Sequence, residues 1–118
     1  MTELTTKLEK LLRKGLEYLS ESSEAELTKR PSPEKWSKKE ILGHLIDSGI
    51  NNLQRFTEIQ FENKPYTIKN YNQEALVKAN DYQNAASNEI INFWLSLNNR
   101  ILNIIQQQTL VFLQFVAE

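Results

Sequence analysis

The segment that most constrains the fold begins at Trp36 and reads WSKKEILGHLIDSGINNLQRF. Ser37 and Glu40 have the spacing of a capping box, in which the serine hydroxyl accepts an orphan backbone amide and the glutamate reaches back to the cap residue. Apolar residues then recur at helical spacing through Phe56, which predicts an amphipathic helix from Ser37 to about residue 62. Such a helix has to bury its apolar face against further helices.

Two other segments supply those helices. Leucines at helical spacing predict a helix over roughly residues 3–20, and apolar residues with heptad-like spacing predict another over roughly 81–107. Glycine and proline number only three each, and no segment alternates as a strand does. A chain of 118 residues is the size of one domain. The sequence therefore predicts a single all-α domain, residues 1–118.

The connections indicate how the helices are ordered. The first is polar and rich in proline, with a short helical turn at SEAEL. The second reads ENKPYTIKNYNQEALVKAN, with a helical turn expected at QEALVKA, and is much longer than most helix–helix connections. It can return along the whole preceding helix, so the helices on either side of it can run parallel. The final segment, TLVFLQFVAE, predicts a short apolar stub packed on the bundle or on a second copy.

Composition excludes several classes of function. Without cysteine there are no disulfides, thiolate nucleophiles or cysteine-bound zinc. The net charge of -1 gives no general attraction to nucleic acid or anionic lipid, and neither a signal peptide nor a membrane span is evident. The chain is expected to be cytoplasmic, with no nucleic-acid or membrane partner. Acidic residues interrupt one basic cluster, which is interpreted as a solvated loop: Lys29, Arg30, Lys35, Lys38 and Lys39.

The only histidine, His44, lies within the capped helix. Asp47, Ser48, Asn51 and Arg55 follow it at helical spacing, on the side opposite the apolar arc. One interpretation is a solvated polar face, with a hydrogen-bonded ladder along the helix. The other is the wall of a polar groove, with His44 as a metal ligand and the other four as supporting residues. One histidine cannot form a three-histidine centre, so carboxylates or a second copy's His44 would have to complete it.

Three motifs around this helix are similar to those of the DinB-like superfamily, bacterial metal-binding four-helix bundles. They are Arg-Pro-x-Pro-x-x-Trp-Ser, Gly-His-Leu-x-Asp-Ser and Asn-Asn-x-x-Arg-Phe, all within KRPSPEKWSKKEILGHLIDSGINNLQRF. The likeness extends over about residues 1–105. It implies an up-down-down-up bundle with a long crossover between the second and third helices. It also implies a relationship to metal-dependent transferases that use small thiols such as bacillithiol or mycothiol.

In that superfamily three histidines hold a divalent metal. His44 matches the one on the second helix, whereas the other two form a His-x-x-x-His pair on the fourth helix. This sequence has no histidine after His44, and its fourth helix is expected to be reduced to the C-terminal stub. The resemblance therefore implies a partial zinc or nickel site at His44 in a C-terminally incomplete member.

Two functions follow from these observations, and they remain alternatives. The first is a divalent-metal-dependent transferase or hydrolase, inactive in this form because the histidine pair is absent, with small thiols as substrates of full-length relatives. The second is a non-enzymatic helical module. It would form a homodimer through the apolar surface that the absent fourth helix leaves open.

Overall fold

The computed structural model describes the backbone of residues 3–117 and the side chains of residues 3–108. Its elements are the helices α1 (Glu3–Glu21), α2 (Glu24–Thr28), α3 (Lys38–Glu58), α4 (Gln73–Ala79) and α5 (Ser87–Ala117), with a 3-10 turn η1 (Tyr82–Asn84) before α5. No strand occurs in this part of the chain. The all-α prediction is confirmed, including both short helical turns in the connections.

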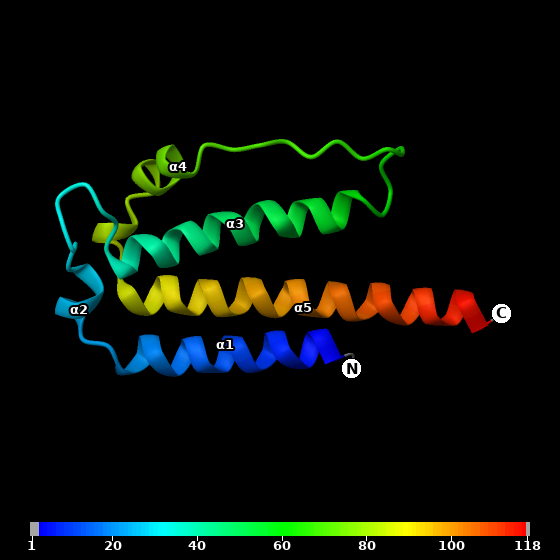
Figure 1. Ribbon diagram of the computed structural model, residues 1–118, viewed down its shortest axis with the longest axis horizontal. Helices are drawn as coiled ribbons and strands as arrows, with labels where there is room; N and C mark the ends of the chain where they lie inside the picture. The colour runs from blue at the N-terminus through cyan, green and yellow to red at the C-terminus, as the bar shows by residue number, and fades with distance from the viewer. Residues whose placement is uncertain (1–2, 118) are drawn as a thin grey trace.

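Three long helices form the body of the molecule (Figure 1). α3 and α5 run in the same direction, and α1 runs in the opposite direction. α5 lies between the other two and packs on both, whereas α1 and α3 approach each other closely at few points, one of which places Lys38 Nζ 5.2 Å from the centre of the Tyr18 ring. The crossover, residues 59–86, returns along α3 and carries α4 and η1. The first three long helices therefore have the up-down-down order that was predicted.

Reciprocal capping boxes mark where two of the helices begin. At α3, Glu40 N donates to Ser37 Oγ and Ser37 N donates to Glu40 Oε1, each at 3.1 Å. Ser23 and Glu26 form the same reciprocal pair at the start of α2. Each pair satisfies amides that a helix leaves without internal partners, so both starts are encoded locally.

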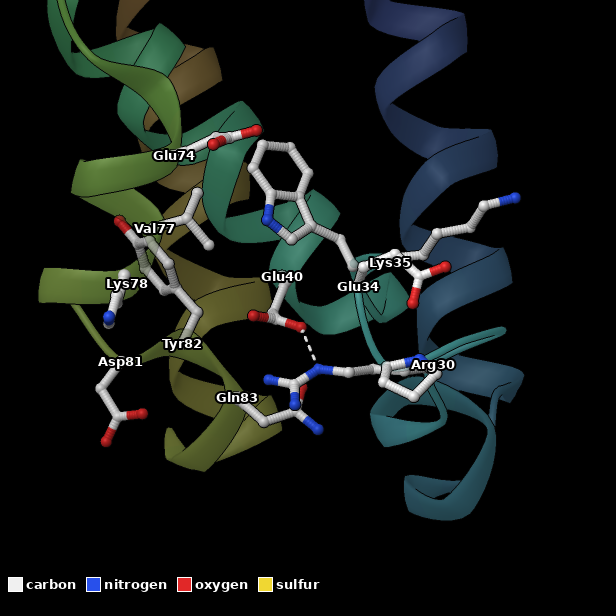
Figure 2. Close-up of a pocket in the computed structure, with 12 residues that line it drawn as sticks. Arg30, Glu34, Lys35, Glu40, Glu74, Val77, Lys78, Asp81, Tyr82 and Gln83 are labelled. Carbon is white, nitrogen blue, oxygen red and sulfur yellow. Dashed lines mark hydrogen bonds and ion pairs between the residues drawn. The ribbon is translucent and has the colours of Figure 1, made fainter.

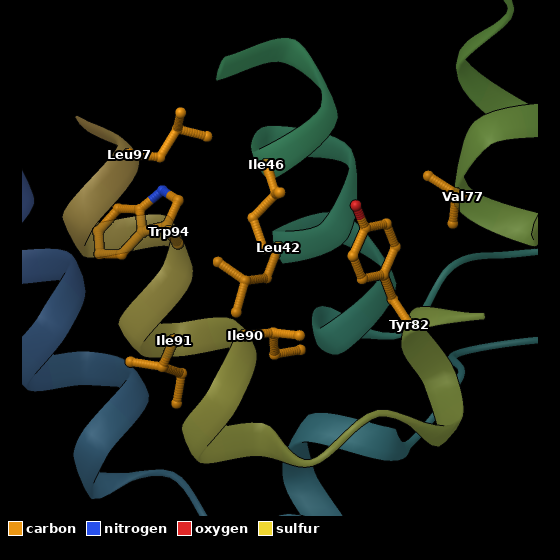
Figure 3. Close-up of a cluster of buried hydrophobic side chains, with 8 residues drawn as sticks. All are labelled: Leu42, Ile46, Val77, Tyr82, Ile90, Ile91, Trp94 and Leu97. Atoms are coloured by element: carbon orange, nitrogen blue, oxygen red, sulfur yellow. The ribbon is translucent and has the colours of Figure 1, made fainter. Parts of the chain in front are cut away.

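The core lies where α3, α5 and the crossover meet (Figure 3). Tyr82 of η1 packs closely on α3 at Gly43, where an added Cβ would stand only 2.0 Å from the Tyr82 ring. Position 43 therefore requires glycine because the ring occupies the space of a side chain. The buried residues of this core come from α3, α5 and the crossover: Leu42, Ile46, Val77, Tyr82, Ile90, Ile91, Trp94 and Leu97.

Three predicted boundaries were wrong, and the first is the end of the capped helix, which lies at Glu58 rather than near residue 62. The third long helix begins at Ser87 rather than near Asp81, because Asp81 adopts a left-handed conformation (φ 50°) that leads into η1. The final segment is not a separate stub either, since the backbone of residues 109–117 continues α5. No glycine or proline follows Gln108 to end the helix. The predicted packing of this segment concerns side chains outside the described residues.

No helix within the described range is long and apolar enough to cross a lipid bilayer.

Candidate functional site

Asp47 is buried beneath the crossover and has only 3% of its surface exposed. Its Oδ1 accepts hydrogen bonds from the Tyr82 hydroxyl at 2.6 Å and from Asn80 Nδ2 at 3.0 Å. Burial and this hydrogen bond to the carboxylate raise the pKa of Tyr82, so its hydroxyl keeps its proton. Asp47 Oδ2 is also buried, with no hydrogen-bond partner among the described residues. The interpretation of this side of α3 as a solvated face was therefore wrong for Asp47.

His44 lies one helical turn before Asp47 and is half-buried. Its ring stands beside the Trp36 indole, with centroids 5.3 Å apart and planes inclined by 36°. Its Nδ1 is buried without a hydrogen-bond partner in the described part of the chain. Two polar atoms without partners, on His44 and Asp47, thus lie three residues apart on one side of α3.

Of the three remaining candidates, two attach the crossover to α3 and the third, Asn51, bonds within the helix. Ser48 Oγ and Tyr71 Oη share a hydrogen bond at 2.7 Å. Arg55 Nη2 donates to the Lys69 carbonyl at 2.8 Å, and its guanidinium carbon lies 5.8 Å from the centre of the Tyr71 ring. Asn51 Nδ2 donates to the Asp47 carbonyl at 2.9 Å.

These contacts only partly match the predicted ladder. Asn51 forms one rung, but Arg55 turns instead to the crossover and to Asn52 Oδ1, at 3.4 Å. The polar side of α3 is therefore mainly a contact surface for the crossover.

A three-ligand metal centre does not fit these residues. His44 Nδ1 is a buried nitrogen of the kind that can coordinate a metal, and Asp47 Oδ2 is the only other buried side-chain nitrogen or oxygen without a hydrogen-bond partner in the described part of the chain. No group of three or more histidine, cysteine, aspartate or glutamate side chains gathers there in a way that could hold a metal ion. Asp47 Oδ1 is already occupied by Tyr82 and Asn80. The donor set consequently falls short of the three-histidine centre that the resemblance implies.

The basic cluster is also less solvated than expected. Lys39 is only 3% exposed, and its Nζ donates to Glu24 Oε1 at 2.8 Å, which ties α3 to α2. Arg30 Nε donates to Glu40 Oε1 at 2.8 Å. Two of the five basic residues therefore connect the proline-containing loop and α2 to the start of α3. Their carboxylate partners are 10 and 15 residues away in the chain, so the sequence spacing did not predict these ion pairs.

Sequence reasoning missed the partners of the polar side chains. Asn80, Tyr82 and Tyr71 all belong to the crossover, which was interpreted as a polar connection. One signal was present: tyrosines recur through residues 66–82, and a tyrosine in a polar segment often packs its ring while its hydroxyl finds a partner.

A second surface lies on the side of α3 that faces α1. A groove of about 380 Å³ runs between the two helices over α5, and a hollow of about 230 Å³ continues it toward the start of α3. Leu45 and Trp94 line both spaces and join them into one trough. Most of its lining is apolar: Leu8, Leu11, Leu12, Gly15, Tyr18, Leu19, Ile41, Leu42, Leu45, Phe56, Trp94, Ile101, Leu102 and Ile105, with Lys38, Ser48, Gly49, Asn52 and Asn98 completing it.

Comparison with known proteins bears on this arrangement of helices. No curated protein and no solved structure gives a significant match. A family model described as the DinB superfamily matches residues 7–115, which include α3 and the crossover and most of α1 and α5. The match spans more than half of the chain, and it agrees with the motifs around His44 and with the parallel arrangement of α3 and α5. The chain belongs to the DinB superfamily.

Proposed function

We propose that this protein is a helical association module, and that a second copy of the chain covers the trough between α1 and α3. The trough is the observation that carries the proposal. Leu11 is 61% exposed and Leu45 is 46% exposed, and together with Phe56 and Tyr18 they form a continuous apolar surface in water. Contiguous apolar surface of this kind marks an interaction site.

The shape of the trough suits a helix. α1 and α3 both pack on α5 and leave a gap between them, so the described residues supply three helices of a four-helix arrangement and leave the fourth position open. A helix laid between α1 and α3 would contact apolar residues of both and complete the bundle in the usual knobs-into-holes manner.

α1 has the pattern that such a helix needs. Leu4, Leu8, Leu11, Gly15 and Tyr18 follow the alternating three- and four-residue spacing of a coiled-coil seam. Leu4, Leu11 and Tyr18 are exposed by 59%, 61% and 52%, so much of the seam is open to solvent, whereas Gly15 lies against Trp94 of α5. In a dimer whose two-fold axis is perpendicular to α1, the two α1 helices would pair antiparallel, which would bring Leu4 near the partner's Tyr18 and bury both troughs at once.

One observation favours a second candidate function. The orphaned atoms of His44 and Asp47 are consistent with the metal-dependent transferase or hydrolase activity that superfamily resemblance implies, with a small thiol as substrate. The described residues supply too few metal-ligating side chains for that centre. Association through the trough depends only on side chains that the structure shows. Association is therefore the function that the geometry supports best.

Sedimentation equilibrium of three matched proteins tests the proposal: the wild-type chain, Leu45→Glu and Ile50→Glu. Both positions are on α3 and similarly exposed, at 46% and 42%, but only Leu45 lines the trough. We expect the wild type and Ile50→Glu to have twice the chain mass of 13.8 kDa, and Leu45→Glu to be a monomer. A charge in an apolar interface without a partner prevents association.

Circular dichroism of each variant checks that the helices remain. A wild-type monomer at high micromolar concentration, or equal loss of association in both variants, would overturn the proposal.

A further inference from the structure

A separate cavity of about 390 Å³ lies at the end of the bundle, where the proline-containing loop approaches α4 and η1 (Figure 2). The loop supplies Arg30 and Trp36, and α3 supplies Glu40. α4 and η1 supply Val77 and Tyr82. A volume of this size is typical of small-molecule sites, and the cavity shares no lining residue with the trough.

An ion pair with spare hydrogen-bonding capacity forms one wall of the cavity. Glu40 is only 8% exposed, and its Oε1 accepts from Arg30 Nε and from Ser37 N, at 2.8 and 3.1 Å. Its Oε2 accepts no hydrogen bond from the described residues, and Arg30 Nη1 and Nη2 donate none to them. The hydrogen bond from Arg30 holds the pKa of the Glu40 carboxyl below its usual range, so both groups are charged at neutral pH. The wall thus offers a ligand one anionic acceptor, Glu40 Oε2, and one pair of cationic donors, Arg30 Nη1 and Nη2.

Gln83 holds this wall in place. Its Nε2 donates to the Thr28 carbonyl at 2.8 Å, and its Oε1 accepts from the Ser37 hydroxyl. Figure 2 shows Gln83 next to Arg30 and Glu40. Through these two contacts Gln83 positions the loop against α3. A fixed wall loses little conformational entropy when a ligand binds.

The opposite wall is apolar. Val77 is 2% exposed and Tyr82 is 7% exposed, and both face the cavity from the crossover side, with Trp36 completing the surface. Lys35, Lys78, Glu34, Glu74 and Asp81 stand around them with both signs of charge, which disfavours a ligand of large net charge of either sign. A ligand that fits all of these features carries both charges close together and an apolar group beside them.

We propose that this cavity binds a small zwitterion bearing an ammonium and a carboxylate, as a free α-amino acid with an apolar side chain does. Glu40 Oε2 accepts from the ammonium, Arg30 donates through Nη1 and Nη2 to the carboxylate, and the side chain lies against Trp36, Val77 and Tyr82. Charge-assisted hydrogen bonds of this kind are the strong ones, and the bidentate fork of arginine matches a carboxylate.

Isothermal titration calorimetry with three probes tests the assignment of both charges: L-leucine, N-acetyl-L-leucine, which lacks the ammonium, and L-leucinamide, which lacks the carboxylate. We expect L-leucine to bind the full chain in the millimolar range or tighter, and each analogue to bind at least about tenfold more weakly. Equal affinity of the three probes, or no heat from L-leucine at tens of millimolar, would overturn the proposal.

Two substitutions locate the binding in this cavity. Glu40→Gln retains an amide oxygen for the capping box while removing the charge, and Arg30→Gln removes the fork. Each is expected to weaken L-leucine binding about tenfold. Glu26→Gln is the matched control, because Glu26 has the same capping position in α2 but lies outside the cavity. Loss of affinity in the control equal to that in Glu40→Gln would contradict the assignment. These titrations are independent of the mass measurements on the trough, so either proposal can fail alone.

Discussion

The two sides of α3 contrast in a way that its residues do not suggest. The polar side carries Asp47 and Ser48, yet it is covered by the crossover and Asp47 is almost fully buried. The apolar side toward α1 carries Ile41, Leu45 and Phe56, yet these are exposed by 45%, 46% and 38%. Burial is decided here by which segment lies alongside the helix, because hydrophobic burial requires a partner surface and a polar group can be buried once it is hydrogen-bonded.

The difference assigns separate roles to the two sides. Contacts on the crossover side are specific hydrogen bonds and one close ring contact, so single-atom changes there should be costly to stability. On the side of the trough, little of the fold depends on the exposed side chains, so changes there should alter association more than folding. The following experiments test this contrast, from the largest expected effect to the smallest.

Gly43→Ala should cause the largest loss of stability. Its Cβ would stand 2.0 and 2.2 Å from atoms of the Tyr82 ring, which is held in the core. We expect a loss of about 3 kcal/mol in the free energy of unfolding, measured with urea. Gly49→Ala is the control on the side of the trough. There the nearest atom is a Leu97 methyl group at 2.7 Å, which can rotate away, so the loss should be smaller. Equal losses would remove the contrast.

Tyr82→Phe should cost about 2 kcal/mol, because it removes a hydrogen bond from a buried carboxylate that already has one oxygen without a partner. Tyr66→Phe removes a comparable hydrogen bond to Glu58, but on the exposed part of the crossover, so its loss should be much smaller. Urea unfolding of both variants makes the comparison. A larger loss from Tyr66→Phe would show that the crossover is held mainly at its exposed end.

Glu40→Gln should lower stability at pH 7 by less than Tyr82→Phe does, and the loss should depend on pH. The hydrogen bond from Arg30 lowers the pKa of Glu40 from its usual 4.5. The contribution of the charged form is therefore fully present above about pH 4.5, and it disappears as the pH falls through the lower, folded-state pKa. Thermal unfolding of both proteins between pH 7 and pH 3 should show the difference closing. A constant difference would mean that the charge of Glu40 contributes nothing.

Divalent metal should have the smallest effect. With His44 as the only histidine, we expect no micromolar binding of zinc or nickel by calorimetry, and the same weak heats from His44→Ala. Tight binding that His44→Ala abolishes would contradict this expectation. It would show that ligands from a second copy, or from outside the described residues, complete a centre at the polar side of α3.

Much of the fold could be predicted because its signals are local. The Ser37–Glu40 capping box, the leucine spacing of α1 and the length of the crossover together predict three long helices with two of them parallel. The end of the last helix was mispredicted because a change in composition after Gln108 was interpreted as a break, although no residue there stops a helix. The candidate site was predicted only as a set of residues on one face. Their environment depends on Asn80, Tyr71 and Tyr82, whose approach to α3 has no signature in local spacing.

The sequence by itself determined the three long helices, the Ser37–Glu40 cap, the up-down-down order and the superfamily, since these follow from helical periodicity, the length of the crossover and motifs read in register. Only the tertiary structure decided which face of α3 is buried, that Gly43 makes room for a tyrosine ring, that Arg30 and Glu40 form a cavity wall, and that α1 and α3 stand apart. Those features join residues distant in the chain. They depend on how the crossover and α5 pack in space, which no window of sequence specifies.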